Sequence, residues 1–186
     1  MKMGRIKLGM VGGGKGSFIG EVHRMAARLD GRYELLAGAF SADAKRAKES
    51  ALDLGITETR SYSSYEIMAE MESALPDGIE AVAIVTPNHL HATVAEAFLK
   101  KGIHVICDKP LTSNLADAEM LAAVAKETGL VFAVTYNYSG YPMVRQARAM
   151  VEAGELGEIR VVQTEFAHGN CATAVEEHSE GAAWRN

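Results

Sequence analysis

Short apolar runs alternate with longer amphipathic segments along most of the chain, and this alternation predicts repeated strand–helix units. The expected strands are residues 6–11, 33–40, 81–85, 103–107 and 130–135, and the expected helices are residues 18–29, 43–54, 64–74, 90–100 and 115–127. A strand that is apolar throughout, such as 81–85, is typical of a parallel sheet covered by helices on both faces. The pattern therefore predicts an α/β protein with a doubly wound, parallel-sheet Rossmann fold.

The pattern changes after residue 140. The segments expected there are a helix at 142–153, a turn at 154–157 and a strand at 159–166, after which no periodicity continues. We therefore expect two regions in the chain. Residues 1–140 are expected to form the Rossmann domain, and residues 141–186 the connecting helix and first strand of a second α+β domain, truncated soon after it begins.

Composition narrows the class of protein. The chain has 186 residues, of which 48% are hydrophobic and 23% charged, as in an ordinary globular protein. Its net charge is -5 and its basic residues are scattered, so we expect no nucleic-acid partner. No apolar run approaches the roughly 18 residues of a membrane span, and the start of the chain has no secretion signal. We therefore expect a cytoplasmic protein with no membrane partner.

A glycine-rich segment, Gly12 to Gly20, lies between the first expected strand and the first expected helix. Dinucleotide-binding fingerprints occur in this context, because glycines let the backbone approach a pyrophosphate and the helix amides face its negative charge. A strict G-x-G-x-x-G reading puts Ser17 in place of the third glycine. We favour a reading in which Gly20 packs the helix against the strand, and a purely structural turn is the alternative. The expected cofactor contacts here are Gly12, Gly14, Gly16, Ser17, Phe18 and Ile19.

The end of the second strand bears on which dinucleotide binds. An acidic residue there would accept hydrogen bonds from the 2′-hydroxyl of an adenosine ribose. The chain has Phe40 and Ser41 instead, followed one helical turn later by Lys45 and Arg46. A hydroxyl and two cations favour NADP over NAD, with a solvated helix surface as the alternative for the cations.

Polar residues follow two more of the expected strands, at the edge where open α/β sheets bind ligands. Strand 81–85 leads into Thr86, Asn88 and His91, which we expect near the cofactor, and Asn88 is also expected to cap the next helix. A structural or solvent-exposed histidine is the alternative for His91. Strand 130–135 leads into Asn137, whose amide could hold the substrate or the nicotinamide. Packing at a domain junction is the alternative for that strand end.

A charged pair, Asp108 and Lys109, directly follows the apolar strand 103–107. A lysine that is partly desolvated at the mouth of a cleft can exchange a proton with a substrate hydroxyl, and its ammonium form polarises the matching carbonyl. Pro110 restricts the backbone of Lys109 and can form a cis peptide bond. Lys109 is therefore the predicted catalytic residue, and both members of the pair are expected near the cofactor. An exposed Asp-Lys turn is the alternative.

The cysteines and histidines give no sign of a metal site. His168, Cys171 and His178 have spacings that fit no zinc pattern, so we expect no metal. Cys107 lies in an apolar strand and is expected to be a small buried thiol.

These motifs together resemble the Gfo/Idh/MocA family, the relatives of glucose–fructose oxidoreductase and inositol dehydrogenase. The likeness extends over residues 5–167 and rests on the glycine loop, residues 86–91, Asp108-Lys109-Pro110, Asn137-Tyr138 and residues 154–159. It implies an NAD(P)-dependent oxidoreductase that transfers a hydride between the nicotinamide and a hydroxyl or carbonyl carbon of a sugar, polyol or related substrate. It also implies that Lys109 is catalytic. The family usually has Glu where this chain has Asp108.

The resemblance further implies a second domain of similar length, which supplies an Asp-x-x-x-His pair and the surface of a homo-oligomer. No Asp-x-x-x-His occurs after residue 150. We therefore expect this chain to be the nucleotide-binding N-terminal part of such an oxidoreductase, and nearly inactive alone. A non-catalytic module that binds or senses NAD(P) is the alternative.

Overall fold

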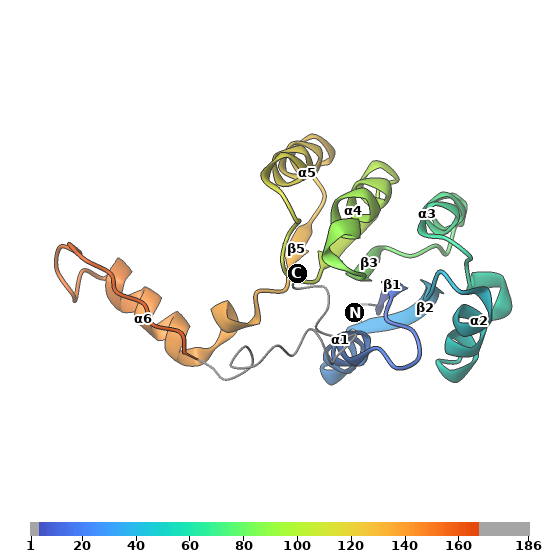
Figure 1. Ribbon diagram of the computed structural model, residues 1–186, viewed down its shortest axis with the longest axis horizontal. Helices are drawn as coiled ribbons and strands as arrows, with labels where there is room; N and C mark the ends of the chain where they lie inside the picture. The colour runs from blue at the N-terminus through green and yellow to red at the C-terminus, as the bar shows by residue number, and fades with distance from the viewer. Residues whose placement is uncertain (1–3, 168–186) are drawn as a thin grey trace. The chain divides into compact units, whose positions relative to one another are not determined.

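The computed structural model describes residues 4–167 and divides into two compact units, Met1–Tyr136 and Asn137–Asn186. The first unit is built on one parallel sheet in the order β2-β1-β3-β4-β5 (Figure 1). Its strands are β1 (Ile6–Gly12), β2 (Tyr33–Ala39), β3 (Ala81–Val85), β4 (His104–Cys107) and β5 (Phe132–Val134). Its helices are α1 (Phe18–Leu29), α2 (Ala44–Asp53), α3 (Tyr65–Ala74), α4 (His91–Lys100) and α5 (Leu115–Thr128). The predicted Rossmann fold is confirmed.

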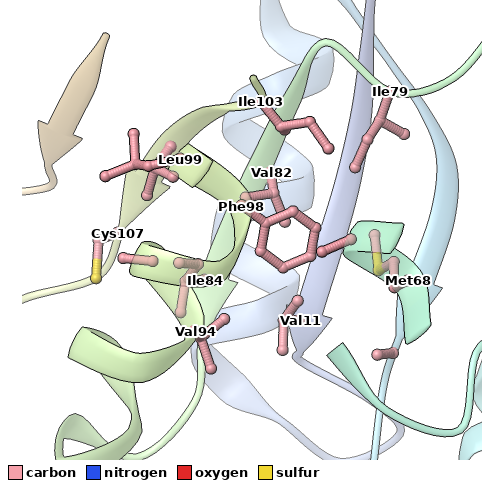
Figure 2. Close-up of a cluster of buried hydrophobic side chains, with 14 of the residues drawn as sticks. Val11, Met68, Ile79, Val82, Ile84, Val94, Phe98, Leu99, Ile103 and Cys107 are labelled. Atoms are coloured by element: carbon pink, nitrogen blue, oxygen red, sulfur yellow. The ribbon is translucent and has the colours of Figure 1, made fainter. Parts of the chain in front are cut away.

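Alternate residues of the central strand β3 pack into two apolar clusters on opposite faces of the sheet. Successive side chains of a strand point to opposite faces, which is why a strand covered on both sides is apolar at every position. Val82 and Ile84 contribute to the cluster that contains Phe98 of α4 (Figure 2). Ala81 and Ala83 contribute to the other cluster, against which Ile19 of α1 packs. This double burial fixes the sheet that carries the candidate site.

Short polar side chains begin most of these helices, as N-caps do in general. The residues whose side chains accept a hydrogen bond from an amide of the first turn are Ser17, Asp43, Ser64 and Asn114. The expectation that Asn88 caps the next helix is wrong. A 3₁₀ turn, Asn88–Leu90, comes between β3 and α4, so Leu90 occupies the cap position and makes no side-chain bond there.

The second unit contains the 3₁₀ turn Asn137–Gly140 and the predicted helix, α6 (Pro142–Glu152). The strand expected at 159–166 is not formed, because a strand needs a neighbour to pair its backbone amides and carbonyls, and no described segment pairs with these residues. The expected division into nucleotide-binding and substrate domains after residue 140 stays a prediction.

None of the helices within residues 4–167 combines the length and the apolar character needed to cross a membrane.

Candidate functional site

A cleft of about 680 Å³ lies at the carboxyl edge of the sheet, within the first unit. Its volume falls in the range of small-molecule and cofactor sites. Several of the residues that the sequence predicts as cofactor contacts line this cleft. They are Gly12, Gly14, Gly16, Ser17, Ser41, Arg46 and Thr86. The cleft therefore collects residues from the loops after β1, β2 and β3, where open α/β sheets bind ligands.

Two glycines that flank the loop after β1 occupy positions that a side chain could not. Gly12 has φ +78°, a conformation that favours glycine, and a Cβ there would lie 2.9 Å from the carbonyl oxygen of Val85. Gly20, on the inner face of α1, packs directly on the backbone of Gly13, and a Cβ on Gly20 would overlap it. This contact supports the sequence reading in which Gly20 serves as the third glycine.

Helix α1 starts directly after this loop. The Ser17 amide donates to the carbonyl of Gly14 at 2.9 Å, and Ser17 Oγ accepts from the amide of Gly20 at 3.2 Å. A helix N-terminus presents amides without intrahelical partners and the positive end of the helix dipole, so it favours an anionic group. Phe18 and Ile19 form this first turn but do not line the cleft, and their contact with a cofactor stays a prediction.

The loop is also tied to α2 through Ser50, which the sequence analysis missed. The Lys15 amide donates to Ser50 Oγ at 2.9 Å, and the Ser50 hydroxyl donates to the carbonyl of Arg46 at 2.6 Å. The Lys15 ammonium lies 3.3 Å from Asp53. Ser50 and Asp53 stand four and seven residues after Arg46, so this face of α2 holds the loop beside the Arg46 backbone. Serine in a helix gave no signal of this contact.

The two cations predicted after β2 differ in their positions. Both cations are exposed, but Arg46 lines the cleft together with Ser41 and Lys45 does not. The structure therefore brings only Arg46 of this pair to the candidate site.

Thr86, at the end of β3, carries a hydroxyl without a protein partner. Its Oγ1 is the one buried side-chain oxygen or nitrogen among the described residues that has no hydrogen bond. Since buried polar atoms are nearly always hydrogen-bonded, and Thr86 lines the cleft, this atom has the capacity to bind a polar ligand group.

Asn88 and His91, which follow Thr86, do not line the cleft. The side chain of His91 is buried, with Nδ1 2.7 Å from the carbonyl oxygen of Pro110 and Nε2 3.0 Å from that of Thr86. His91 thus places one ring nitrogen beside a carbonyl oxygen of each of two loops, and the cofactor contact predicted for it stays untested.

Asp108 directly follows β4, the strand next to β3, and its carboxylate is held by two side chains. The Thr135 hydroxyl donates to Asp108 Oδ1 at 2.9 Å, and His23 Nε2 lies 3.5 Å from the same oxygen. Burial alone would raise the pKa of Asp108, but the hydrogen bonds from His23, Thr135 and the following backbone amide lower it below its ordinary value. Neither His23 nor Thr135 was predicted to belong to the site, although His23 lies one helical turn after Gly20.

Lys109 is exposed at the same edge of the sheet, and its bond to Pro110 is cis. The partial desolvation expected for this lysine stays a prediction. Asn137 belongs to the second unit, so its contact with a cofactor stays a prediction.

Among the described residues, no group of three or more His, Cys, Asp or Glu side chains could hold a metal ion. His168, Cys171 and His178 lie outside those residues. Cys107 is buried without a disulfide, as expected, and burial raises the pKa of its thiol to about 12.

Comparison with known proteins agrees with this geometry. Residues 6–136 match the profile of GFO_IDH_MocA, the oxidoreductase family with an NAD-binding Rossmann fold. The uncharacterized oxidoreductase YfiI of Bacillus subtilis is 42% identical over 97% of this chain and 46% of its own length. The levoglucosan dehydrogenase of Pseudarthrobacter phenanthrenivorans is 30% identical over 84% of this chain and 40% of its own length.

A solved structure is also similar, that of an inositol dehydrogenase homolog complexed with NAD⁺ from Azotobacter vinelandii. It is 44% identical, with a TM-score of 0.92, over 98% of this chain and 47% of that one. The chain thus spans less than half the length of each of these three relatives.

Proposed function

This chain belongs to the Gfo/Idh/MocA oxidoreductase family, and from that premise we propose that it binds NAD(P)(H) in the cleft at the carboxyl edge of its sheet. The observation that carries the proposal is the unpartnered, buried hydroxyl of Thr86 in a cleft that also contains the glycine loop. A dinucleotide supplies both the polar groups that such a hydroxyl binds and the pyrophosphate that such a loop accommodates.

The residues of the cleft fit a dinucleotide along its length. The backbone from Gly12 to Ser17 and the start of α1 would hold the pyrophosphate, because four of these six residues are glycines and the helix end is positive. Ser41 and Arg46 would hold the adenosine ribose, and Thr86 would hold a polar group further along the sheet edge.

The proposed reaction is the reversible oxidation of a hydroxyl carbon in a sugar, polyol or related compound. The bound nicotinamide supplies hydride exchange with that carbon. Lys109 Nζ would take the hydroxyl proton during oxidation and return it during reduction, and its ammonium form would stabilise negative charge on the substrate oxygen. The similarity to proteins named for inositol and levoglucosan supports this substrate class.

The surroundings of Lys109 in the described residues favour cofactor binding over turnover by this chain. Lys109 is exposed, and a lysine that works as a proton carrier is usually enclosed with its substrate. We therefore propose that the 186-residue chain binds the cofactor and alone turns over little or no polyol. The homo-oligomer and the cytoplasmic location stay predictions.

Titration with NADH tests the cofactor proposal. The expected result is a saturable change in NADH fluorescence, with a Kd between about 1 µM and 1 mM, as for many enzyme ligands. Circular dichroism of the same sample checks that the protein is folded. Folded protein without a saturable signal for NADH or NADPH would refute the proposed function, and steady oxidation of a polyol would contradict the expected inactivity.

Replacing Arg46 with alanine separates the two dinucleotides. We propose that the site accepts both and that Arg46 binds the 2′-phosphate of NADP(H). Hydrogen bonds to charged groups contribute about 1.5–3 kcal/mol, so Arg46→Ala should weaken NADPH binding by about 10-fold or more and NADH binding by less than about threefold. The matched control is Lys48→Ala on the same helix, since Lys48 pairs with Glu58 and does not line the cleft. Equal losses for both dinucleotides would disprove this role of Arg46.

A further inference from the structure

Lys109 lies between two residues that are each held by a histidine. On its N-terminal side, the carboxylate of Asp108 lies 3.5 Å from His23 Nε2. On its C-terminal side, the carbonyl oxygen of Pro110 lies 2.7 Å from His91 Nδ1. The two histidines come from different helices, α1 and α4, so they hold the lysine segment from separate parts of the fold.

The first contact connects the lysine segment to the glycine-loop helix. His23 stands one turn after Gly20, the residue that packs on the glycine loop. The side chains of His23 and Asp108 are only 10% and 14% exposed, and Thr135 donates to the same carboxylate oxygen. The backbone amide of Asp108 also donates to the carbonyl of Ile84 in β3 at 2.9 Å. Both the main chain and the side chain of Asp108 are therefore fixed.

The second contact connects the lysine segment to the cleft. His91 is 1% exposed, and its Nε2 lies 3.0 Å from the carbonyl oxygen of Thr86. Thr86 is the cleft residue with the unpartnered hydroxyl. A neutral imidazole can donate through one nitrogen, and the protonated ring can donate through both. The ring therefore lies between the Thr86 and Pro110 carbonyls, and it donates to one of them when neutral and to both when protonated.

Packing alone does not explain these two histidines. Both stand where a core helix would ordinarily present an apolar side chain, and only three polar or charged residues are fully buried among those described, Ser50, Glu72 and His91. A buried polar side chain is costly unless its hydrogen bonds are satisfied. Both histidines direct nitrogens toward oxygens of residues adjacent to Lys109.

We propose that His23 and His91 are positioning residues that hold the backbone on either side of Lys109 in a fixed place relative to the cofactor cleft. The inference rests on the proposed catalytic role of Lys109. Side chains that orient a reacting group are needed because displacements of about 1 Å impair catalysis. Neither histidine touches the reacting atoms in this proposal, and each acts through a neighbour of the lysine.

Nuclear magnetic resonance of the isotope-labelled 186-residue chain tests both contacts without relying on turnover. In His23→Leu, the pKa of Asp108, followed by its carboxyl carbon signal, should rise because the carboxylate loses a donor that lowers it. His23→Gln keeps an N–H donor and should recover part of this change. In the cofactor-free spectrum, the Lys109 amide signal should move in His91→Leu and return toward its wild-type position in His91→Gln. If the leucine variant does not fold, the glutamine variant still tests the contact.

Addition of NADH separates positioning from cofactor binding. The NADH-induced shift of the Lys109 amide should fall by about twofold or more in both leucine variants, while the Kd for NADH in His23→Leu changes by less than about threefold. The matched control is His89→Leu, because His89 is an exposed histidine close to His91 in sequence and does not line the cleft. It should leave the Asp108 titration and the Lys109 signal unchanged.

Two results would overturn the inference: an Asp108 titration that is the same in wild type and His23→Leu, or a Lys109 amide that is unaffected by either leucine variant. Absence of NADH binding would instead count against the proposed function. The Asp108 titration and the cofactor-free Lys109 spectrum would still decide whether the two histidines hold this segment, because neither measurement involves the cofactor.

Discussion

Replacing Lys109 with methionine is expected to lower the turnover rate by about 10²- to 10⁴-fold in a form of the protein that oxidises a polyol, because general acid–base catalysis contributes about that much. Methionine keeps most of the side chain's length but removes the nitrogen that carries the proton. The Kd for NADH should change by less than about threefold, since Lys109 lies outside the cleft that would hold most of the dinucleotide. Turnover is followed by NADH absorbance and the Kd by fluorescence titration.

The control for this variant is Lys126→Met, which removes an exposed lysine from the last turn of α5. It should retain the wild-type rate and cofactor affinity. A wild-type rate in Lys109→Met would remove Lys109 from the mechanism. A large loss of NADH affinity in Lys109→Met with an unchanged turnover rate would show that Lys109 only binds the cofactor.

The largest expected effect on stability is at Glu72 of α3. Its carboxylate is buried and has an ion-pair partner and hydrogen-bond donors around it. It forms an ion pair with Arg60, accepts from the Tyr62 hydroxyl at 2.7 Å and accepts from the Ile79 amide at 3.0 Å. These partners come from the 3₁₀ turn Glu58–Arg60, from the segment that follows it and from the residues just before β3. One side chain therefore joins three segments at the edge of the core.

Glu72→Ala is expected to lower the free energy of unfolding by about 3–5 kcal/mol, because removing one member of a buried ion pair leaves the other charge without its partner. Urea denaturation followed by circular dichroism measures the change. Glu70→Ala, on the same helix, is the matched control, since Glu70 is 66% exposed and its ion pair with Lys101 is worth at most about 1 kcal/mol. A similar, small loss for both variants would show that the Glu72 contacts contribute little.

Most of the first unit could be predicted from the sequence because its signals are local. An apolar run such as β3 is typical of a strand buried on both faces, and short polar residues such as Ser17 and Ser64 favour a helix start directly after them. The glycine loop and Lys109 were identifiable for the same reason, because each directly follows a recognisable strand. The family resemblance agrees with the match of residues 6–136.

The expectations that were wrong depended on neighbours that the local pattern does not specify. Asn88 has the chemistry of a helix cap, but the intervening 3₁₀ turn moves the helix start to His91. Residues 159–166 alternate as a strand does, yet alternation cannot supply a pairing partner, and none is present among the described residues. The cofactor contact predicted for Lys45 stays a prediction, and the rotation of α2 about its axis decides that Arg46, its neighbour in sequence, lines the cleft.

The sequence by itself determined the strand–helix order, the position of the glycine loop and the presence of a lysine at the end of a buried strand, because each depends on residues close together in the chain. Only the tertiary structure decided which side chains surround that lysine. His23 and Asp108 are 85 residues apart, and Thr135 and Asp108 are 27 apart, so no periodicity or spacing connects them. They meet because the parallel sheet brings the ends of β4 and β5 together with the inner face of α1.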